Sequence, residues 1–356
     1  MGAFVVPGVV VAASVARMDL ADLTTLRLGG PAKAVLEPTS EAELIDAVRI
    51  ADEAADPVLL VAGGSNLVVA DEGFDGTVIR VVTRGISVDS DACSGAMVTV
   101  AAGEPWDGIV DRAVSEGWVG VEALSGIPGS TGATPIQNVG AYGQEVSQTV
   151  ATVRAYDRFD RKVRTIHAVD CGFTYRSSRF KVEPHRYVVL SVAFQLALGD
   201  LSEPIAYAEL ARTLGVEVGE RAPAADVRSA VLGLRRGKGM VLDPADHDTW
   251  SAGSFFTNPI LTAAEADALP EHAPRFAQAD GTVKTSAAWL IDHAGYGKGY
   301  GSGQASLSTK HALALTNRGG ATTAELLTLA REVRDGVRQA YGITLVNEPV
   351  LVGCSL

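Results

Sequence analysis

The sequence predicts an α+β protein of two or three domains, and three observations support this class. Helix and strand patterns alternate over residues 40–196. After Leu198 the chain changes to helical patterns separated by loops rich in glycine and proline, which indicates a new domain. Its 356 residues, at about 150 per domain, are enough for two or three separate cores.

The first predicted helix covers residues 40–54. Ser40 and Glu43 form a capping-box pattern, and apolar residues recur at helical spacing after it, at Leu44, Ala47, Val48 and Ala51. A buried strand is predicted at 58–62 and a second apolar run at 67–70, with Gly63-Gly64-Ser65-Asn66 between them. The pattern therefore predicts strand, glycine turn, strand.

The next elements continue the mixture of helix and strand. Strands are predicted at 77–82 and 97–101, a helix at 104–116, and strands near 150–156 and 187–196. Thr322 and Glu325 form a second capping box, which opens a helix that stops at Gly342. A last strand at 343–346 would put Glu348 at a strand end, where the chain can return to its earlier parts.

Charge and cysteine content exclude several classes of protein. The 30 basic and 42 acidic residues give a net charge of −12, which argues against binding to nucleic acid or to an anionic membrane. The three cysteines, Cys93, Cys171 and Cys354, are isolated in sequence and show no metal-binding spacing, so we expect no bound metal. Their isolation and odd number also fit a reducing compartment, so we expect a cytoplasmic location. The uncharged N-terminal segment ends in Ser14-Val15-Ala16, loosely like a signal-peptidase site, but we interpret residues 1–18 as an extension outside the folded core.

Two glycine-rich segments are candidates for ligand binding. The turn at Gly63-Gly64 follows a strand, so its backbone N–H groups can converge on an anion, although a plain hairpin turn explains the pattern about as well. Residues 126–143 hold five glycines and two prolines with almost no charge. Such a segment suits close backbone approach to a flat ligand; a structural Ω-loop is the alternative.

Five motifs in one order carry a resemblance. They are Gly-Gly-Ser-Asn-Leu at 63–67, Ile-Pro-Gly-Ser-x-Gly-Ala-x-Pro-Ile-Gln-Asn-x-Gly-Ala-Tyr-Gly at 127–143, Tyr-Arg-Ser-Ser-Arg-Phe at 175–180, Ala-Gly-Ser-Phe-Phe-x-Asn-Pro at 252–259 and Glu-Pro at 348–349. Over about residues 20–353 the chain resembles the UDP-N-acetylenolpyruvoylglucosamine reductase family, flavoenzymes that make UDP-N-acetylmuramate for peptidoglycan. Tyr207 matches the type that carries a tyrosine loop.

The resemblance implies a two-subdomain FAD-binding fold of the vanillyl-alcohol-oxidase type, followed by an α/β substrate-binding domain. Residues 19–62, joined by the C-terminal strand at about 344–356, would form the first FAD subdomain and 63–199 the second. Residues 200–343 would form the substrate domain. FAD would be bound noncovalently, because no motif offers the histidine or cysteine link of other flavoproteins of this fold, and NADPH would reduce it.

The cofactor contacts implied by the resemblance come from both glycine-rich segments. In the diphosphate loop they are Gly63, Gly64, Ser65, Asn66 and Leu67; in the flavin bed they are Gly126, Pro128, Gly129, Gly132, Ala133, Gln137, Asn138, Gly140, Ala141, Tyr142 and Gly143.

Three residues match the catalytic positions of the family. Arg176 would stabilise negative charge near the enolpyruvyl carboxylate, Ser254 would protonate C2, and Glu348 would assist from the other side, with a pKa raised by burial or by substrate charge. Taken singly, each has an ordinary explanation: a surface or ion-paired arginine, a cap or turn serine, and a charged residue that guards a strand edge.

Three further residues match positions that contact the nucleotide sugar: Tyr207, Lys238 and Asn258. A half-buried helix tyrosine and a solvated basic loop are the alternatives for the first two. The glycine-rich segment 295–303 has no assigned contact, and we expect a mobile loop over the pocket.

The resulting expectation is a monomeric, cytoplasmic, NADPH-dependent reductase of UDP-N-acetylglucosamine enolpyruvate, acting on this small molecule alone. Two alternatives remain at this point. An FAD-dependent sugar or alcohol oxidase of the same fold would consume oxygen with its substrate. A non-catalytic nucleotide-sugar binding protein would bind its ligand without flavin.

Overall fold

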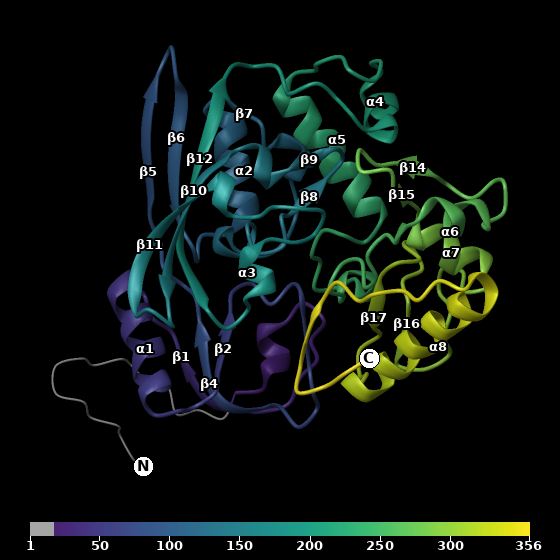
Figure 1. Cartoon of the computed structure of the whole chain (residues 1–356), viewed down its shortest axis with the longest axis horizontal. Coiled ribbons are helices and arrows are strands. Elements are labelled where there is room, and N and C mark those ends of the chain that lie inside the picture. Colours follow the sequence, from purple (N-terminus) through teal and green to yellow (C-terminus); the bar gives the residue numbers. More distant parts are fainter. Residues whose placement is uncertain (1–17) are drawn as a thin grey trace. The chain divides into compact units, whose positions relative to one another are not determined.

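The computed structural model describes residues 18–356, and these residues form two compact units (Figure 1). Unit 1 combines Ala32–Gly63 with Asp75–Arg236. Unit 2 combines Met18–Pro31, Gly64–Phe74 and Gly237–Leu356. The extension predicted for residues 1–18 lies, up to Arg17, outside the described residues. The four-part division predicted above remains a prediction.

A small sheet in unit 1 has the strand order β1–β4–β2, formed by Ala32–Leu36, Phe74–Arg80 and Val58–Val61. Strands β2 and β4 run parallel. Helix α1, Glu41–Glu53, starts at Ser40, whose side chain accepts a hydrogen bond from Glu43 N. Leu44 and Val48 of α1 share one buried apolar cluster with Ile79 of β4.

The larger sheet of unit 1 is antiparallel and has the order β11–β10–β12–β6–β5, with β7 paired to β12. Its strands are Lys162–His167, Val150–Asp157, Tyr187–Leu198, Gly95–Ala101, Ile86–Asp91 and Trp118–Val119. Trp106 opens helix α2, Trp106–Ser115, and lies 5.6 Å from the ring of Phe194 in β12. The indole therefore joins the helix to the sheet core.

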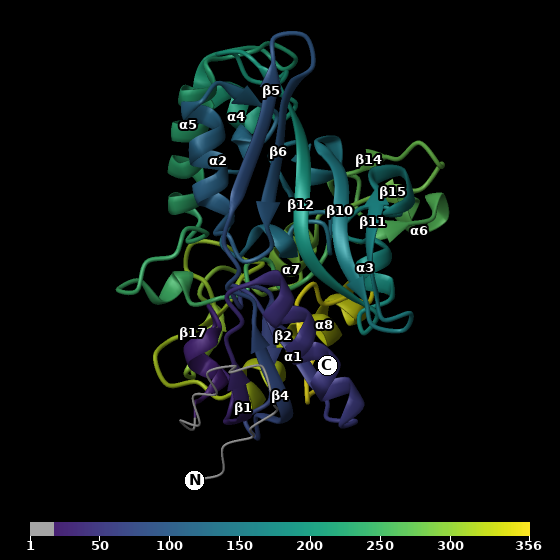
Figure 2. The same cartoon turned by 90° about the vertical axis from the view of Figure 1, so that its left-hand side faces the viewer.

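Helices α2 and α5, Ala224–Gly237, lie side by side on one side of this sheet (Figure 2). Arg228 of α5 pairs with Asp107 and Asp111 of α2, at 2.7 and 2.9 Å. The short elements of unit 1 are the 3₁₀ turns Glu122–Leu124, Thr131–Ala133, Val146–Gln148 and Ala168–Asp170, the strands β8 (Gly140–Ala141) and β9 (Gln144–Glu145), and the helices α3 (Arg179–Val182) and α4 (Ala208–Leu214).

Unit 2 is built around helix α8, Thr323–Tyr341, whose Leu326 and Val333 are fully buried in a core with Phe255 and Leu290. The last strand, β18 (Val350–Val352), runs parallel to β3 (Leu67–Val69). The other elements are β16 (Ala305–Leu307), β17 (Leu315–Asn317), β13 (Ile260–Leu261), β14 (Phe276–Ala277), β15 (Val283–Lys284), α6 (Ala263–Asp267), α7 (Ala287–His293) and the 3₁₀ turns Leu20–Leu23 and His247–Thr249.

The α+β class and the predicted helices at 40–54, 104–116 and 322–342 are confirmed, as are the strands at 58–62, 77–82, 97–101, 150–156 and 187–196 within a few residues. The predicted strand at 343–346 is wrong. This stretch is extended without ladder pairing, and the strand follows Glu348 instead of preceding it. Strand β2 is also less buried than predicted, since Val61 alone of its four residues is fully buried.

The return of the C-terminus to earlier chain is confirmed within unit 2. Val350, Leu351 and Val352 pair with Leu67, Val68 and Val69. At the start of α8, the carboxylate of Asp71 accepts the N–H groups of Thr323 and Ala324, at 2.7 and 3.0 Å. Across residues 18–356, no helix combines the length and apolar character needed to span a membrane.

Candidate active site

The loop from Gly63 to Leu67 connects strands of two different sheets, because β2 pairs with β4 and β3 pairs with β18. The plain hairpin considered from sequence is therefore excluded. A Cβ on Gly63 would lie 2.6 Å from Gly129 Cα, so the two glycine-rich backbones can approach this closely only because Gly63 lacks a side chain. Gly64 has φ +59°, and a Cβ there would lie 1.8 Å from the carbonyl oxygen of Leu23.

The first part of the long glycine-rich segment packs on the start of α2. Trp106 N donates to Gly129 O at 3.0 Å, and Gly126 N donates to the Asp107 carboxylate at 2.6 Å. Gly132 lies so close to Ala102 that a Cβ would meet the Ala102 Cβ at 2.4 Å. Ala133 ends the 3₁₀ turn Thr131–Ala133. Pro128 precedes this turn in the sequence, and Gln137 follows it.

Asp107 is the charged anchor of this stretch. Burial tends to raise its pKa, but hydrogen bonds from Arg228 and from Gly126 N outweigh that effect and hold the pKa below its usual range. The carboxylate therefore stays ionised at neutral pH. It ties the start of the predicted flavin bed to α2 and, through Arg228, to α5.

The second part of the segment is a hairpin, in which Gly140–Ala141 pairs with Gln144–Glu145. Its two turn residues, Tyr142 and Gly143, have φ +50° and +88°, the sign that two-residue hairpin turns of the mirror-image types require. Asn138, with φ +46°, donates to Glu145 Oε2 at 2.8 Å and to Thr174 O at 3.2 Å. These bonds fix the hairpin against the Tyr175–Phe180 motif.

Arg176 lies against this hairpin. Its Nη2 donates to Gly140 O at 2.7 Å and its Nη1 to Asn138 O at 3.4 Å. Its φ is +54°, a conformation that residues with a Cβ rarely adopt, and a Cβ on Gly140 would lie 3.1 Å from Nη1. The structure thus brings Arg176 together with Asn138 and Gly140 in unit 1.

Tyr207 precedes α4 and lies on the same hairpin. Its ring meets that of Tyr142 edge to face, with centroids 5.4 Å apart. Ala206 covers Gly143, where an added Cβ would lie 2.9 Å from the Ala206 Cβ. Tyr207 remains 44% exposed.

Ser254 and Glu348 lie together in unit 2. Glu348 N donates to Phe255 O at 2.8 Å, and Phe256 and Asn347 form the adjoining bridge. Phe255 and Phe256 are each 1% exposed, with ring centroids 5.1 Å apart, and they anchor this pair of extended segments in the core. The Ser254 and Glu348 side chains are only partly buried.

Asn66 extends the same group, since Val350 N donates to Asn66 O at 2.9 Å. Lys238 follows the end of α5 and is half-buried. Asn258 also has a structural role that its sequence motif did not predict. Its Oδ1 accepts a hydrogen bond from the N–H of Ala287 at 3.0 Å and so caps the start of α7.

Two unit 1 residues that sequence reasoning missed bear on the site. Ser130 is 5% exposed, and its hydroxyl has no hydrogen-bond partner within the described structure, which is unusual for a buried polar atom. Glu122 is fully buried and accepts from Gly120 N, Gln144 Nε2 and Glu203 N, which links the flavin-bed hairpin to the segment before Tyr207. The Pro-Gly-Ser-Thr-Gly run was a signal that could have identified Ser130, whereas no local pattern could have identified Glu122.

These features fit a bound FAD. The contact between Gly63 and Gly129 makes a backbone surface without side chains, and the buried Ser130 hydroxyl is available to a polar atom of a ligand. Among residues 18–356, no group of three or more histidine, cysteine or acidic side chains is placed to hold a metal ion.

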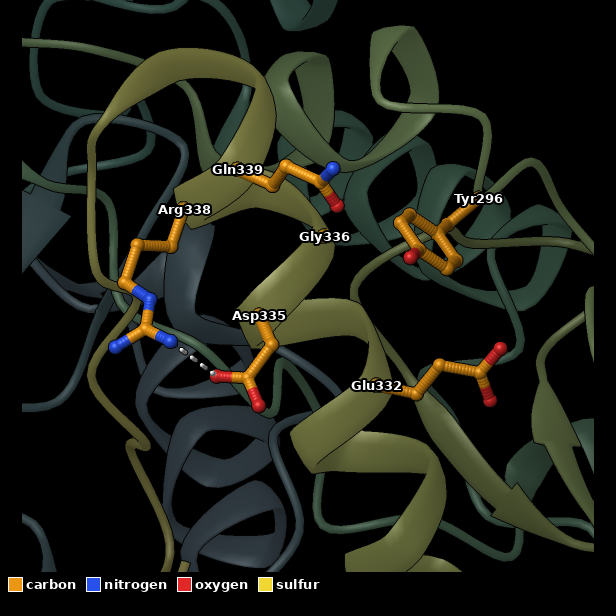
Figure 3. A pocket seen from close by; sticks show the side chains of 6 residues that line it. All are labelled: Tyr296, Glu332, Asp335, Gly336, Arg338 and Gln339. Atoms are coloured by element: carbon orange, nitrogen blue, oxygen red, sulfur yellow. Dashed lines mark ion pairs between the residues drawn. The ribbon is translucent and has the colours of Figure 1, made fainter.

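Two tyrosines of the glycine-rich segment 295–303 contact helix α8, and the mobile loop that we expected there stays a prediction. Tyr300 donates to Glu332 at 2.5 Å, and the Tyr296 ring covers Gly336, where a Cβ would lie 2.0 Å from its hydroxyl. A cavity of about 490 Å³ opens there between Tyr296 and α8 (Figure 3), and none of the predicted site residues lines it.

Comparisons with known proteins identify two domains in the chain. Residues 32–165 match the family model of an FAD binding domain, and residues 243–352 match that of the UDP-N-acetylenolpyruvoylglucosamine reductase C-terminal domain.

Similar whole chains carry the same enzyme name. The chain is 60% identical to UDP-N-acetylenolpyruvoylglucosamine reductase of Cutibacterium acnes, over 95% of this chain and 90% of that protein, and 59% identical to that of Thermobifida fusca, over 95% and 98%. The crystal structure of UDP-N-acetylenolpyruvylglucosamine reductase from Thermus caldophilus is 26% identical, with a TM-score of 0.66 over 96% of this chain and 99% of that chain.

Proposed function

The chain belongs to the UDP-N-acetylenolpyruvoylglucosamine reductase family, and from this we propose that Arg176, Ser254 and Glu348 perform the family's reaction in it. The enzyme is an FAD-dependent oxidoreductase that uses NADPH to reduce the enolpyruvyl ether of a UDP-N-acetylglucosamine derivative, in the synthesis of peptidoglycan. No observation favours an oxidase or a binding protein without turnover.

The observation that best supports the proposed roles is the backbone bond from Glu348 to Phe255. It places the Ser254 hydroxyl and the Glu348 carboxylate, which are separated by 94 positions in sequence, on adjoining extended segments, and both residues are only partly buried. Two groups that can each hold or pass a proton are thus fixed in one unit.

Bound FAD would supply the hydride chemistry that connects NADPH to C3 of the enolpyruvyl group. The residues proposed to hold it are the backbone of Gly63–Leu67 and of Gly126–Gly143, with the Ser130 hydroxyl offered to a polar atom of the cofactor. Binding is noncovalent in this proposal.

Arg176 stabilises the negative charge that spreads from C2 to the carboxylate after the hydride reaches C3. Its guanidinium is permanently charged and planar, and its bonds to Gly140 O and Asn138 O hold it in place before substrate arrives. A pre-positioned charge needs no reorganisation during the reaction, which is the basis of electrostatic catalysis.

Ser254 delivers the proton to C2, which completes the addition of one hydride and one proton across the double bond. A serine hydroxyl is a weak acid, so the donor must be resupplied through a relay, and Glu348 on the adjoining segment is the proposed partner in that task. Tyr207, Lys238 and Asn258 are proposed to contact the nucleotide diphosphate. Tyr207 is the best supported of the three, because its side chain is exposed beside the hairpin.

We further propose that the enzyme acts as a cytoplasmic monomer and that residues 200–343 form the substrate-binding part, as the family resemblance implies. Gel filtration combined with light scattering tests the monomer, for which a mass near 37 kDa is expected.

An anaerobic absorbance titration tests the proposed function. The purified protein should be yellow, NADPH should bleach it, and the enolpyruvyl nucleotide should restore the colour in one equivalent. Protein without flavin, or reduced protein that the nucleotide does not reoxidise, would overturn the proposal. Rapid oxygen consumption with a sugar or alcohol and no NADPH would indicate the oxidase, because such a substrate would reduce the flavin and oxygen would reoxidise it.

A further inference from the structure

We propose that Arg27 and Asn317 are positioning residues for Ser254: they fix the loop that carries it, through the segment Thr24–Arg27. The inference rests on the role proposed above for Ser254. All of the contacts lie within unit 2.

Asn317 ends β17 and is 3% exposed. Its Nδ2 donates to Leu26 O at 3.1 Å and to Arg27 O at 3.2 Å. Its Oδ1 accepts three backbone N–H groups, those of Gly319, Gly320 and Ala321, at 2.9, 3.1 and 3.1 Å. Both donor hydrogens and the acceptor are therefore used, so one side chain joins the N-terminal segment to the turn before α8.

Arg27 has φ +53°, a conformation that costs free energy for any residue with a Cβ and that persists only where surrounding contacts hold it. Two contacts do so here. Asn317 binds its carbonyl oxygen, and its guanidinium carbon lies 3.8 Å from the centroid of the Trp250 ring. The backbone and the side chain of Arg27 are thus fixed independently.

Two hydrogen bonds connect the segment and β17 to the Ser254 loop, and a third lies within the loop itself. Thr25 Oγ1 donates to Ser251 O at 2.7 Å, and Asn317 N donates to Trp250 O at 3.0 Å. Gly253 N then donates to Ser251 Oγ at 3.2 Å. Because Ser251 and Ala252 are buried, a displacement of Thr25 or of Arg27 is passed along the chain toward Ser254.

The far side of Ser254 is equally fixed, since Phe255 N donates to Leu313 O at 2.7 Å and Phe255 O accepts Glu348 N. Ser254 therefore lies between two anchored residues. Catalytic geometry is sensitive to small displacements, and a shift of about 1 Å caused by a remote substitution can cost about 100-fold in rate.

The Asn317→Asp variant separates this role from a purely structural one. Aspartate keeps an acceptor oxygen for Gly319, Gly320 and Ala321, so the turn before α8 is preserved. It loses the donor to Leu26 O and Arg27 O and places an oxygen against both carbonyls. Arg27→Gln keeps the backbone strain and removes only the cation over Trp250.

The test compares the two variants with the wild-type holoenzyme and with Arg161→Gln, a control at an exposed arginine of similar φ, +52°. Rapid anaerobic mixing measures flavin reduction by NADPH and reoxidation by the enolpyruvyl nucleotide separately. Hydrogen exchange of residues 251–258 without substrate reports on the Phe255 amide.

We expect Asn317→Asp and Arg27→Gln to slow reoxidation by roughly 10- to 100-fold and to leave reduction unchanged, with faster exchange at 251–258. Wild-type reoxidation and exchange in both variants would overturn the proposal, as would an equal loss in both half-reactions. A wild-type enzyme that the nucleotide does not reoxidise would instead overturn the proposed function, while the exchange data would still decide the positioning role.

Discussion

At the scale of single residues, Arg176 is constrained both in its backbone and in its side chain. Its φ is positive, and its guanidinium donates to two carbonyl oxygens, those of Asn138 and Gly140. The motif Tyr-Arg-Ser-Ser-Arg-Phe predicted a functional arginine, but its dependence on a glycine 36 positions earlier became visible only in the fold.

Arg176→Lys should retain one positive charge and lose the planar pair of donors. We expect reoxidation by the enolpyruvyl nucleotide to slow by about 100-fold or more, the size found when one donor to a developing anion is removed. Arg161→Lys, an arginine with nearly the same φ but on the β10–β11 turn, is the matched control. Equal rates for Arg176→Lys and the control in single-turnover mixing would remove Arg176 from the proposed role.

At the scale of elements, local patterns predicted those whose ends carry their own signals. Ser40 and Thr322 cap α1 and α8 within a residue of the predicted starts. Strands β5 and β11 were missed because they lie at the sheet edges and are largely exposed, so neither shows apolar alternation. The apolar run at 343–346 resembled a strand, yet it bonds to Thr257 as an isolated extended segment.

The partners of the glycine-rich segments could not be predicted from the sequence. Local composition predicted close backbone approach at Gly63 and at 126–143, but the partner of Gly63 is Gly129, which no local pattern names. Likewise, the bond between Glu348 and Phe255 depends on how the C-terminal chain returns in unit 2. Long-range pairings of this kind follow from the whole fold.

Gly63→Ala should weaken FAD retention, because its Cβ would lie 2.6 Å from Gly129 Cα and one backbone must move. Gly108→Ala is the control: it lies inside α2 with open space around its Cβ position and should change stability by at most about 1 kcal/mol, in the stabilising direction. The ratio of flavin to protein absorbance after dialysis measures the effect. Full flavin retention in Gly63→Ala would show that this contact does not shape the cofactor site.

At the scale of the whole molecule, acid stability depends on buried carboxylates such as Asp157. Burial tends to raise its pKa, but hydrogen bonds from Arg186 and from the N–H groups of Asp160 and Phe159 lower the pKa below its usual range. The folded chain thus binds fewer protons here than the unfolded chain. The stabilisation is complete above the unfolded pKa of about 3.9 and is lost as the pH falls through the folded value.

Asp157→Asn should therefore lower the free energy of unfolding at pH 7 by roughly 1–3 kcal/mol, and this difference from wild type should shrink as the pH falls below about 4. Urea unfolding at a series of pH values measures it. Asp75→Asn, at a carboxylate whose side chain is 96% exposed, should stay close to wild type throughout. If the free energies of unfolding of Asp157→Asn and wild type differed by the same amount at all pH values, ionisation of Asp157 would not be the cause of the stabilisation.

The Ser254→Ala variant is the most direct test of the proposal that Ser254 acts in flavin reoxidation by the enolpyruvyl nucleotide and not in flavin reduction by NADPH. Rapid anaerobic mixing should show flavin reduction by NADPH at the wild-type rate, because the hydroxyl takes no part in that step. Reoxidation by the enolpyruvyl nucleotide should slow by about 100- to 10,000-fold, which is the rate enhancement that a positioned proton donor usually provides. Unchanged reoxidation, or equal losses in both half-reactions, would contradict the role of Ser254 as the donor to C2.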